Sequence, residues 1–443
     1  MSQIDIAPWL AESRWPTVPI RLVARLGSGH TPSRSKPEYW TNCTEPWITL
    51  ADVWQLRSGQ TNVITETKEK VSKLGLANSS ATLHPAQTVI LSRTASVGFS
   101  AIMGNDMATS QDFATWTCGP RLDPRYLLHA LRGMAPDLKR VATGSTHKTI
   151  YMPDIEQLRV PLPSMEEQRR IADFLDTETS RIDKLTKARR RQLSLLNARF
   201  EGAILSAIRG QEEPHPRTES RLDWLGSVPK DWPVMPVSYH FEVLLGKMLN
   251  QESARGPHLR KYLRNTNVQW DHIETDDLLL MNFPPEERNR YAIRPGDLLI
   301  CEGGEPGRAA IWNGQVEEIY YQKALHRVRP RSYSSPRWLY YCLRAATSLN
   351  VFAVEGNATT ISHLTGEQLR AHRFPFPQRK VQDRLVARLD ASARAHTRLK
   401  RVLQEQLALL AERRQALITA AVTGQFDVST ASGRNVTDGV PTP

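Results

Sequence analysis

Two long stretches of the chain carry apolar residues at alternating intervals of three and four, the spacing of one face of an α-helix. They cover about 165–209 and about 379–423, and neither contains a proline. Their apolar positions are, in turn, Ile171, Leu175, Ile182, Leu185, Leu193, Leu196, Phe200 and Ile204, and Leu385, Leu389, Leu399, Leu403, Leu407, Leu410, Leu417 and Ala421. At a rise of 1.5 Å per residue, each stretch predicts a helix of ~65 Å.

A helix of this length with a single apolar face cannot bury that face inside one small domain. The economical arrangement packs the two helices against each other as a coiled coil, which is antiparallel if a two-fold axis relates the halves of the chain. Glu178, Arg189 and His396 interrupt the apolar seam. We therefore expect irregular packing or partner contacts there.

The two stretches are copies of one sequence. "LLNARFEGAILSAIRGQ" (Leu195–Gln211) and "LLAERRQALITAAVTGQ" (Leu409–Gln425) align at an offset of 425 − 211 = 214 residues. That offset continues without a gap back to Pro161–Pro163 and Pro375–Pro377, and 16 of the 51 aligned pairs are identical. The identical pairs include Gln168/Gln382, Leu175/Leu389, Leu185/Leu399, Leu193/Leu407, Leu196/Leu410, Ile204/Ile418 and Gly210/Gly424. A gapless match of this length indicates an internal duplication.

The duplication extends more loosely into the segments before each helix. "PAQTVILS" and "PGDLLICE" are short apolar runs that predict strands, whereas "PRYLLHALR" and "PRWLYYCLR" predict helices that begin with proline. The fold class is therefore α+β: two repeated α/β domains joined by two long helices, with pseudo-two-fold symmetry. The predicted parts are a first domain (1–160), a first helix (161–210), a Pro-rich polar linker (211–230), a second domain (231–374), a second helix (375–425) and a disordered tail (426–443).

Composition narrows the class of protein. The 443 residues exceed one ordinary core, no run of 18 apolar residues predicts a membrane span, and the first residues do not predict a secretory signal. The four cysteines are isolated, which fits a reducing cytoplasm. A net charge of +12 and a pI of about 9.6 favour a polyanionic partner, most simply nucleic acid. The alternative is a basic protein from a genome with Arg-rich codon usage.

Motifs for catalysis do not stand out in the sequence. It contains neither a GxxxxGK[ST] phosphate loop nor an HExxH metal motif. The glycine-rich "ICEGGEPG" (Ile300–Gly307) lacks the lysine of a phosphate loop and predicts a turn after a strand. We therefore expect a binding protein without a catalytic, metal or cofactor site of its own.

Polar loops supply candidates for binding nucleic acid. Arg and Lys side chains suit phosphates and guanine edges, while Asn, Gln, Ser and Thr suit adenine edges and the sugar–phosphate backbone. The candidates are Thr31, Ser33, Arg34, Lys36, Arg93, Thr146, His147, Lys148, Lys247, Asn250, Arg255, Arg260, Lys261, Arg264, Asn265, Asn357, Thr359 and Thr360. The alternative for each residue is an ordinary solvated loop.

The repeated segment resembles the specificity subunit of Type I restriction–modification enzymes. The resemblance rests on "VPLPSMEEQRRIADFLDTETSRIDKL" (Val160–Leu185) with "ARFEGAILSAIRG", and on "PFPQRKVQDRLVARLD" (Pro375–Asp390) with "ERRQALITAAVTGQ". "RLDWLGSVPKDWPV" (Arg221–Val234) resembles the family's usual start of the second domain, so the resemblance covers essentially residues 14–425. The second copy departs from the family pattern at Val381, where a glutamate is usual, but it keeps Gln382.

The resemblance implies a non-catalytic reader of double-stranded DNA. Two target recognition domains would each read half of a bipartite, asymmetric sequence, and the antiparallel coiled coil would fix the gap. Two methyltransferase subunits would dock on the helices, and restriction subunits would join them. The implied coiled-coil and docking residues are Gln168, Leu175, Leu185, Leu193, Leu196, Ile204, Gln382, Leu389, Leu399, Leu407, Leu410 and Ile418. S-adenosylmethionine, ATP and Mg would belong to the partner subunits, in a cytoplasmic, nucleoid-associated complex.

Two other functions remain open at this point. The chain could be a coiled-coil scaffold whose modules bind protein or RNA, or a stand-alone methyltransferase or nuclease with unfamiliar motifs. A split DNA motif selected from random duplexes would separate the resemblance from both.

Overall fold

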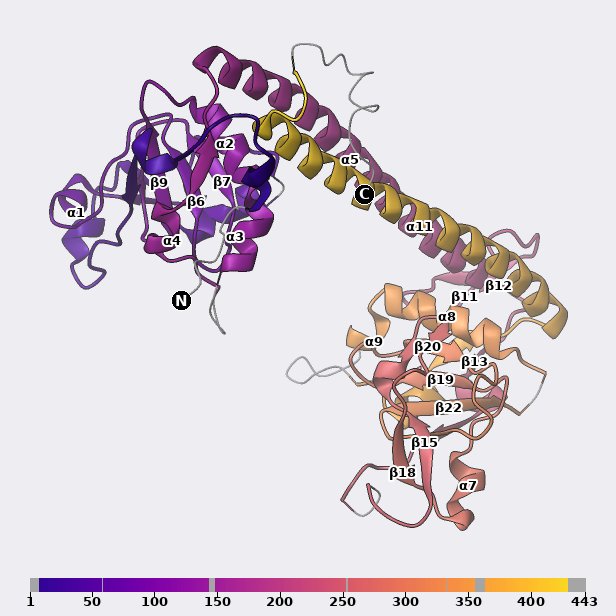
Figure 1. Cartoon of the computed structure of the whole chain (residues 1–443). Coiled ribbons are helices and arrows are strands. Elements are labelled where there is room, and N and C mark those ends of the chain that lie inside the picture. Colours follow the sequence, from indigo (N-terminus) through magenta and orange to yellow (C-terminus); the bar gives the residue numbers. More distant parts are fainter. Residues whose placement is uncertain are drawn as a thin grey trace. The chain divides into compact units, whose positions relative to one another are not determined.

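The computed structural model describes residues 8–57, 59–142, 148–251, 254–331, 333–354 and 363–428. The chain divides into two compact units, the first made of Met1–Arg191 with Leu403–Pro443 and the second of Gln192–Val402. Each unit contains one body of strands and short helices together with parts of both long helices (Figure 1). The predicted α+β class is confirmed.

The body of the first unit is built on two sheets. The larger has the order β2-β9-β6-β7-β4, with strands β2 (Ala24–Ser28), β4 (Val63–Ile64), β6 (Val89–Ser92), β7 (Ser100–Met103) and β9 (Phe113–Cys118). The smaller has the order β5-β3-β8, with strands β3 (Glu45–Ile48), β5 (Glu69–Val71) and β8 (Ala108–Thr109). A separate pair joins β1 (Thr17–Pro19) to β10 (Arg159–Pro161). The short helices are η1 (Pro8–Glu12), η2 (Ile20–Leu22), η3 (Pro37–Trp40), η4 (Leu50–Leu56), α1 (Lys73–Ala77), α2 (Pro124–Gly133), α3 (Ala135–Val141) and α4 (Met152–Glu156).

The body of the second unit repeats this plan. Its larger sheet has the order β14-β22-β19-β20, with strands β14 (Phe241–Leu245), β19 (Leu298–Cys301), β20 (Ala309–Ile311) and β22 (Leu325–Pro330). Its smaller sheet has the order β18-β15-β21, with strands β15 (Leu259–Leu263), β18 (Leu279–Asn282) and β21 (Tyr320–Tyr321). Two further pairs join β13 (Val234–Pro236) to β23 (Arg373–Pro375) and β16 (Val268–Gln269) to β17 (His272–Ile273). The short helices are α6 (Val237–His240), η5 (Asn265–Asn267), α7 (Pro285–Tyr291), α8 (Pro336–Ser348), α9 (Val351–Val354) and α10 (Gly366–Ala371).

The two bodies share one topology. The orders β2-β9-β6-β7 and β14-β22-β19-β20 are antiparallel throughout. In each smaller sheet the central strand, β3 or β15, is antiparallel to one neighbour and parallel to the other. The fold therefore carries the duplication into the bodies, where the sequence match is loose.

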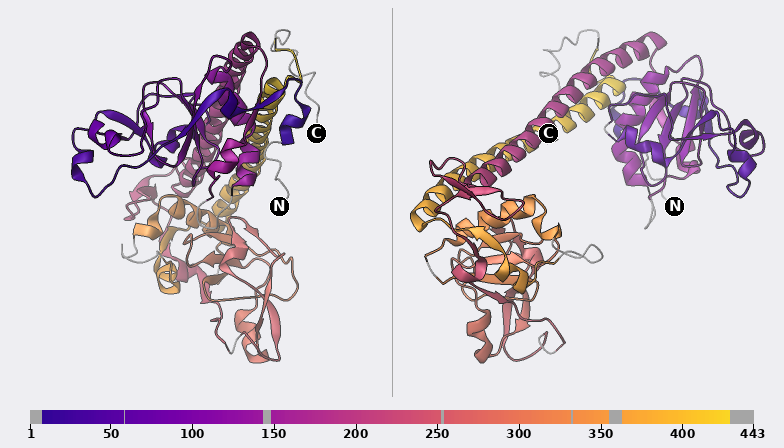
Figure 2. Two further views of the ribbon diagram at one scale, coloured as in Figure 1. Left: turned by 60° about the vertical axis from the view of Figure 1, so that its left-hand side comes forward. Right: turned by 180° about the vertical axis from the view of Figure 1, so that it is seen from behind.

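A helix between the large sheet and the long helices completes each core. The predicted strands correspond to β6 and β19, which are buried at every position. The predicted proline-led helices correspond to α2 and α8, whose first turns are capped by Asp123 and Ser335. In both units the larger sheet packs on one side of this helix and the long helices on the other (Figures 1 and 2).

The long helices begin and end where the pattern predicted. They are α5 (Met165–Ile208) and α11 (Arg379–Thr423). Within the first unit Arg414 Nε of α11 lies 3.2 Å from Asp183 Oδ1 of α5, and within the second His396 Nε2 lies 2.9 Å from Asn197 Oδ1. The helices thus touch inside each unit, while their pairing as one antiparallel coiled coil stays a prediction.

Two leucines predicted for the apolar seam lie outside it. Leu185 and Leu399 are 50% and 52% exposed. The half-buried residues near these positions are instead Thr186 and Arg189 in α5 and His396 in α11. One residue turns an α-helix by about 100°, so a leucine beside the seam position faces away from it. The other seam residues are buried or half-buried.

Each Gly-Gln ending closes a long helix beneath a tryptophan of a body. Gly210 and Gly424 have positive φ angles of 58° and 74°. A Cβ on Gly424 would lie 2.7 Å from Cη2 of Trp15, and a Cβ on Gly210 would lie 2.9 Å from Cη2 of Trp232. The left-handed conformation and the close ring both require glycine, which explains why both copies keep it.

The segment expected to be a linker has a structure of its own. Within residues 211–230, β11 (Arg217–Glu219) pairs with β12 (Ser227–Pro229). Leu225 and Val228 of this hairpin are buried in the core of the second unit. The hairpin is therefore a part of the second unit. Its Pro-rich composition suggested a linker because the two apolar residues do not stand out in the sequence.

The beginning of the expected tail packs on the first unit. Phe426 lies edge-on to Phe174, with ring centroids 5.6 Å apart, and Val428 is buried. The rest of the predicted tail, residues 429–443, lies outside the described residues.

Candidate nucleic-acid interface

The candidate side chains gather in equivalent connections of the two bodies. Between β2 and β3 the first body carries Thr31, Ser33, Arg34 and Lys36, and between β14 and β15 the second carries Lys247, Asn250 and Arg255. Both connections lead into the central strand of the smaller sheet. Four more candidates lie on β15 or directly after it, namely Arg260, Lys261, Arg264 and Asn265.

Arg34 is held in a fixed orientation on the first body. Its Nη2 lies 2.6 Å from Glu69 Oε2 on β5, and its guanidinium carbon lies 3.8 Å from the ring centre of Trp40. The nearby Lys36 Nζ donates to Tyr39 Oη at 3.2 Å, and this hydrogen bond raises the pKa of Lys36. Both cations thus lie against aromatic rings at the surface, which favours a positioned charge over a freely moving one.

A second group of candidates meets around Gln111 in the first body. Thr31 Oγ1 donates to Gln111 Oε1 at 2.6 Å, and Arg93 Nε donates to the Gln111 carbonyl at 2.9 Å. The carbonyl of the exposed Lys148 accepts from Ala95 N at 2.9 Å, in the turn between β6 and β7. The exposed Ser33 lies against another hydroxyl, and the candidates Thr146 and His147 lie outside the described residues.

Three candidate cations of the second body are already paired with carboxylates. Lys247 Nζ bonds to Glu287 and to a backbone carbonyl. Arg260 Nε lies 3.1 Å from Glu318 Oε2, and Arg264 Nη2 lies 2.6 Å from Asp277 Oδ2. These pairs reduce the positive charge that the loops offer to a polyanion.

The remaining candidates of the second body differ in accessibility. Asn265 is held inward, since its Nδ2 donates to Gly303 O at 2.8 Å and its Oδ1 accepts from Arg308 at 2.7 Å. This contact fixes the glycine-rich turn between β19 and β20, as predicted for that segment. Asn250 is exposed, and so are Lys148, Arg255 and Lys261, which have no acidic partner within the described ranges. Asn357, Thr359 and Thr360 lie outside those ranges.

The repeated glutamines hold the long helices to their own bodies. Gln168 Oε1 accepts from Asp123 N at 2.9 Å, and Gln382 Oε1 accepts from Ser335 N at 2.9 Å. Each glutamine also donates from Nε2 to the carbonyl of the last proline of Pro-x-Pro, at 3.0 and 2.7 Å. Both side chains are buried. They are therefore engaged inside the chain and are not offered to a docking partner.

Arg125 and His129 of α2 bind two aspartates of α5 and so fasten the first body to this helix. Arg125 Nη1 lies 2.7 Å from Asp173 Oδ1 and 3.4 Å from Asp176 Oδ2. The hydrogen bond to Asp173 raises the pKa of Arg125. His129 Nε2 lies 2.9 Å from Asp176 Oδ1, and burial lowers the pKa of His129, so the neutral ring donates to the carboxylate.

The second body uses the equivalent arginine, Arg337 of α8, to bind α11. Arg337 Nε donates to Asp390 Oδ1 at 2.8 Å, and its two terminal nitrogens bond to Asp271. Burial alone would lower the pKa of Arg337, but these carboxylates raise it. Tyr341 also donates to Asp390, at 2.5 Å. In both units, therefore, an arginine of α2 or α8 binds an aspartate of a long helix and fixes the body to that helix.

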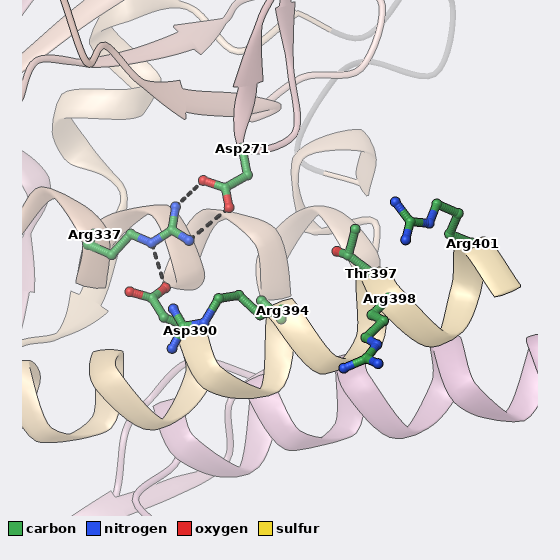
Figure 3. Close-up of a pocket in the computed structure, with 8 residues that line it drawn as sticks. Asp271, Arg337, Asp390, Arg394, Thr397, Arg398 and Arg401 are labelled. Atoms are coloured by element: carbon green, nitrogen blue, oxygen red, sulfur yellow. Dashed lines mark hydrogen bonds and ion pairs between the residues drawn. The ribbon is translucent and has the colours of Figure 1, made fainter.

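The sequence analysis did not single out a basic pocket beside this arginine. The pocket has a volume of about 560 Å³ and is lined by Asp271, Arg337, Asp390, Ala393, Arg394, Thr397, Arg398 and Arg401 (Figure 3). Arg394, Arg398 and Arg401 come from α11 at spacings of four and three, which places them on one face of the helix. That spacing was the signal available in the sequence.

The described residues contain neither a metal-binding cluster nor a membrane-spanning helix. Within the ranges that the structure describes, no three His, Cys, Asp or Glu side chains come together as ligands for a metal ion. No helix in that part of the chain has the length and apolar character needed to cross a membrane.

The repeated topology and its equivalent polar connections define a protein with two related modules on shared long helices. Residues 12–195 match the family model of the Type I restriction modification DNA specificity domain. This match confirms the resemblance inferred from the repeated helix.

Specificity subunits of Type I restriction enzymes are among the curated relatives, and one solved structure shares the fold. The chain is 26% identical over 270 residues to the Type I restriction enzyme MjaIX specificity subunit of Methanocaldococcus jannaschii, covering 59% of this chain and 57% of that protein. It is 22% identical over 302 residues to the EcoKI specificity subunit of Escherichia coli K12, covering 65% and 62%. The chain thus spans about 60% of the length of these two relatives. A chain from a solved type I R-M system has the same fold, with a TM-score of 0.70, 19% identity and coverage of 93% and 98%.

Proposed function

We propose that this protein is a DNA-reading specificity subunit of a Type I restriction–modification complex. Each body reads one half of a bipartite, asymmetric duplex target. The helices α5 and α11 pair as an antiparallel coiled coil and keep the two half-sites at a fixed separation. Methylation and cleavage belong to partner subunits, which bind S-adenosylmethionine, ATP and Mg²⁺, in the cytoplasm at the nucleoid.

The observation that carries the proposal is one topology presented twice with different side chains. The connection between β2 and β3 offers Arg34 stacked on an aromatic ring, and the equivalent connection between β14 and β15 offers the exposed Asn250 and Arg255. The two connections occupy the same place in the fold but carry different side chains. This combination suits two modules that bind DNA in the same way and recognise different sequences.

The side chains support a division between specificity and affinity. Arginine forks and amides at the connections match base edges, while exposed lysines such as Lys148 and Lys261 match phosphates. Ion-paired candidates such as Arg264 must leave a carboxylate before they bind DNA, so they favour selective contacts over general attraction.

Exposed leucines on the long helices support docking of two copies of one partner. Leu185 and Leu399 are 50% and 52% exposed, and Leu195 and Leu409 are 59% and 62% exposed. Within each of these pairs the two residues are 214 positions apart, so both copies expose the same apolar positions. Exposed apolar surface that recurs in a duplicated element fits two equivalent interfaces, one for each methyltransferase subunit, to which restriction subunits are added.

The test is selection of DNA by the full chain, reconstituted with its methyltransferase subunits, from a library of random duplexes. Sequencing of the bound fraction is expected to give two short, different motifs separated by a gap without sequence preference. A contiguous motif, or no enrichment at all, would overturn the proposal in favour of a scaffold that binds protein or RNA.

A further inference from the structure

Most of the excess positive charge lies in the middles of the two long helices. Between Asp183 and Glu201, α5 has no acidic residue and six basic ones, Lys184, Lys187, Arg189, Arg190, Arg191 and Arg199. Between Asp390 and Glu405, α11 has no acidic residue and four basic ones, Arg394, Arg398, Lys400 and Arg401. These ten charges compare with a net charge of +12 for the whole chain. Outside these two stretches the net charge is +2, because acidic residues offset the other cations, including the nine candidate cations of the loops.

Most of these helix cations are exposed and form no ion pair in the described residues. The eight that do so are Lys184, Lys187, Arg190, Arg191, Arg199, Arg394, Arg398 and Lys400. By contrast, the loop candidates Arg34, Arg260 and Arg264 are each paired with a carboxylate. A run of exposed cations without an ion pair in the described residues thus follows the helices.

Such a charge pattern costs helix stability. Lys184 and Lys187, and likewise Arg394 and Arg398, are neighbours three or four residues apart on one helix face. Like charges at these spacings destabilise a helix. In the second unit, burial and then the positive charges of Arg344 and Lys400 lower the pKa of His396. A bound polyanion would remove this repulsion.

Both copies keep a positive charge at two of these positions. Lys184 and Lys187 precede Arg398 and Arg401 by 214 residues. Lysine and arginine share a positive charge but differ in donor geometry, so their exchange retains electrostatic attraction and discards the planar fork. The exchange of lysine for arginine between the copies fits contacts to the uniformly charged phosphate backbone of DNA. It fits less well with recognition of defined carboxylates on a protein surface.

In the second unit some of these cations line a pocket. Arg394 and Arg398 line the pocket of about 560 Å³ beside Arg337 (Figure 3). Arg337 is neutralised by Asp271 and Asp390, whereas Arg394 and Arg398 have no such partner in the described part of the chain. The pocket therefore combines a fixed polar wall with two available guanidinium groups.

We infer that the basic middles of α5 and α11 bind the phosphates of the DNA gap between the two half-sites. The inference rests on the proposed function and adds that the unread gap is held by the protein. The loops then supply sequence selection, and the helices supply a sequence-independent share of the affinity with its salt dependence.

The test uses the full chain reconstituted with its methyltransferase subunits, on a duplex carrying the selected half-sites. The variant R394Q/R398Q removes two exposed cations. A plot of log Kobs against log salt concentration has a negative slope, and each lost phosphate contact makes it less steep by about 0.9. The slope of the variant is therefore expected to be less steep than that of wild type by about 2, while the selected half-sites stay the same. Methylphosphonate linkages placed in the gap should weaken binding by wild type and affect the variant less.

The matched control is R379Q/R384Q. It removes the same charge from the same helix, but Arg379 and Arg384 are already paired with Asp383 and Glu213. Its salt slope should stay at the wild-type value. Equal slopes for both double variants and wild type on a split target would overturn the inference and leave the proposed function standing.

Other outcomes separate the remaining explanations. If R394Q/R398Q lost methyltransferase subunits while its DNA salt slope stayed unchanged, the cations would serve a protein partner and the inference would be wrong. If it altered one base preference, they would read sequence and not phosphates. If wild type selected no split motif, the inference and the proposed function would fall together.

Discussion

At the scale of single residues, the two copies retain the side chains that hold each body to its helix. Gln168 and Gln382 make the same pair of hydrogen bonds to a helix cap and to the preceding Pro-x-Pro. Asp176 and Asp390 each receive an arginine from α2 or α8. The residues that are identical in both copies therefore have a structural role. The residues around them differ between the copies, so the two bodies can bind different ligands.

The glycines that end the long helices give a direct test of this construction. Gly424→Ala and Gly210→Ala place a Cβ at positive φ against Trp15 and Trp232, and each should lower the free energy of unfolding by about 1–3 kcal/mol. Denaturant titration measures the change. The control is Gly202→Ala in α5, where a Cβ meets no atom within 4 Å, and it should add about 0.5–1 kcal/mol. Equal effects for the three variants would contradict the packing described.

His372 makes the second body sensitive to acid. It is 9% exposed between the rings of Phe352 and Phe374, and burial lowers its pKa from 6.5 to about 4. Because the folded pKa lies below the unfolded value, the unfolded chain binds the extra proton as pH falls below 6.5. The stabilisation present above pH 6.5 is therefore lost as pH falls toward about 4, by up to about 3 kcal/mol.

The measurement compares wild type with His372→Gln by denaturant titration at pH 8 and pH 4.5. The difference at pH 8 gives the packing cost of the substitution alone. Between the two pH values the variant should lose about 2–3 kcal/mol less than wild type. Parallel pH profiles for the two proteins would show that His372 does not titrate in this way.

At the scale of elements, periodicity and caps made the helices predictable. The 3.6-residue pattern fixed α5 and α11 closely, and proline after a capping Asp or Ser fixed the starts of α2 and α8. The hairpin β11–β12 escaped because its Pro-rich composition resembles a linker, and its anchors are recognisable only against the core they enter. Leu185 and Leu399 were placed in the seam because a pattern of threes and fours leaves the phase uncertain by one residue.

The misplaced leucines lead to a prediction for subunit assembly. Leu185→Glu combined with Leu399→Glu alters positions that are about half exposed, so thermal unfolding should change little. If these residues dock methyltransferase subunits, the double variant should lose them on size-exclusion chromatography of the reconstituted complex. The control, Leu417→Glu, changes a buried residue of α11 and should unfold the first unit instead. Full assembly by the double variant would remove these leucines from the interface.

At the scale of the whole molecule, composition indicated a polyanion but not where it binds. The candidate loops were found from residue type, yet Arg34, Arg260 and Arg264 turned out to be paired with carboxylates. Two of those partners are remote in sequence, 35 residues away for Arg34 and 58 for Arg260, so no local pattern could reveal them. The positive charge of the helix middles could be recognised in the sequence as two stretches without acidic residues.

The central claim is that two reading modules are held at a distance set by the helices. Removing seven residues from the middle of α5 and seven from the middle of α11 keeps the apolar faces in phase to about 20° and shortens each helix by ~10 Å. DNA rises 3.4 Å per base pair, so selection from random duplexes should return the same two half-sites with the gap shorter by about three base pairs. Changed half-sites, or an unchanged gap in a variant that still binds, would contradict the account.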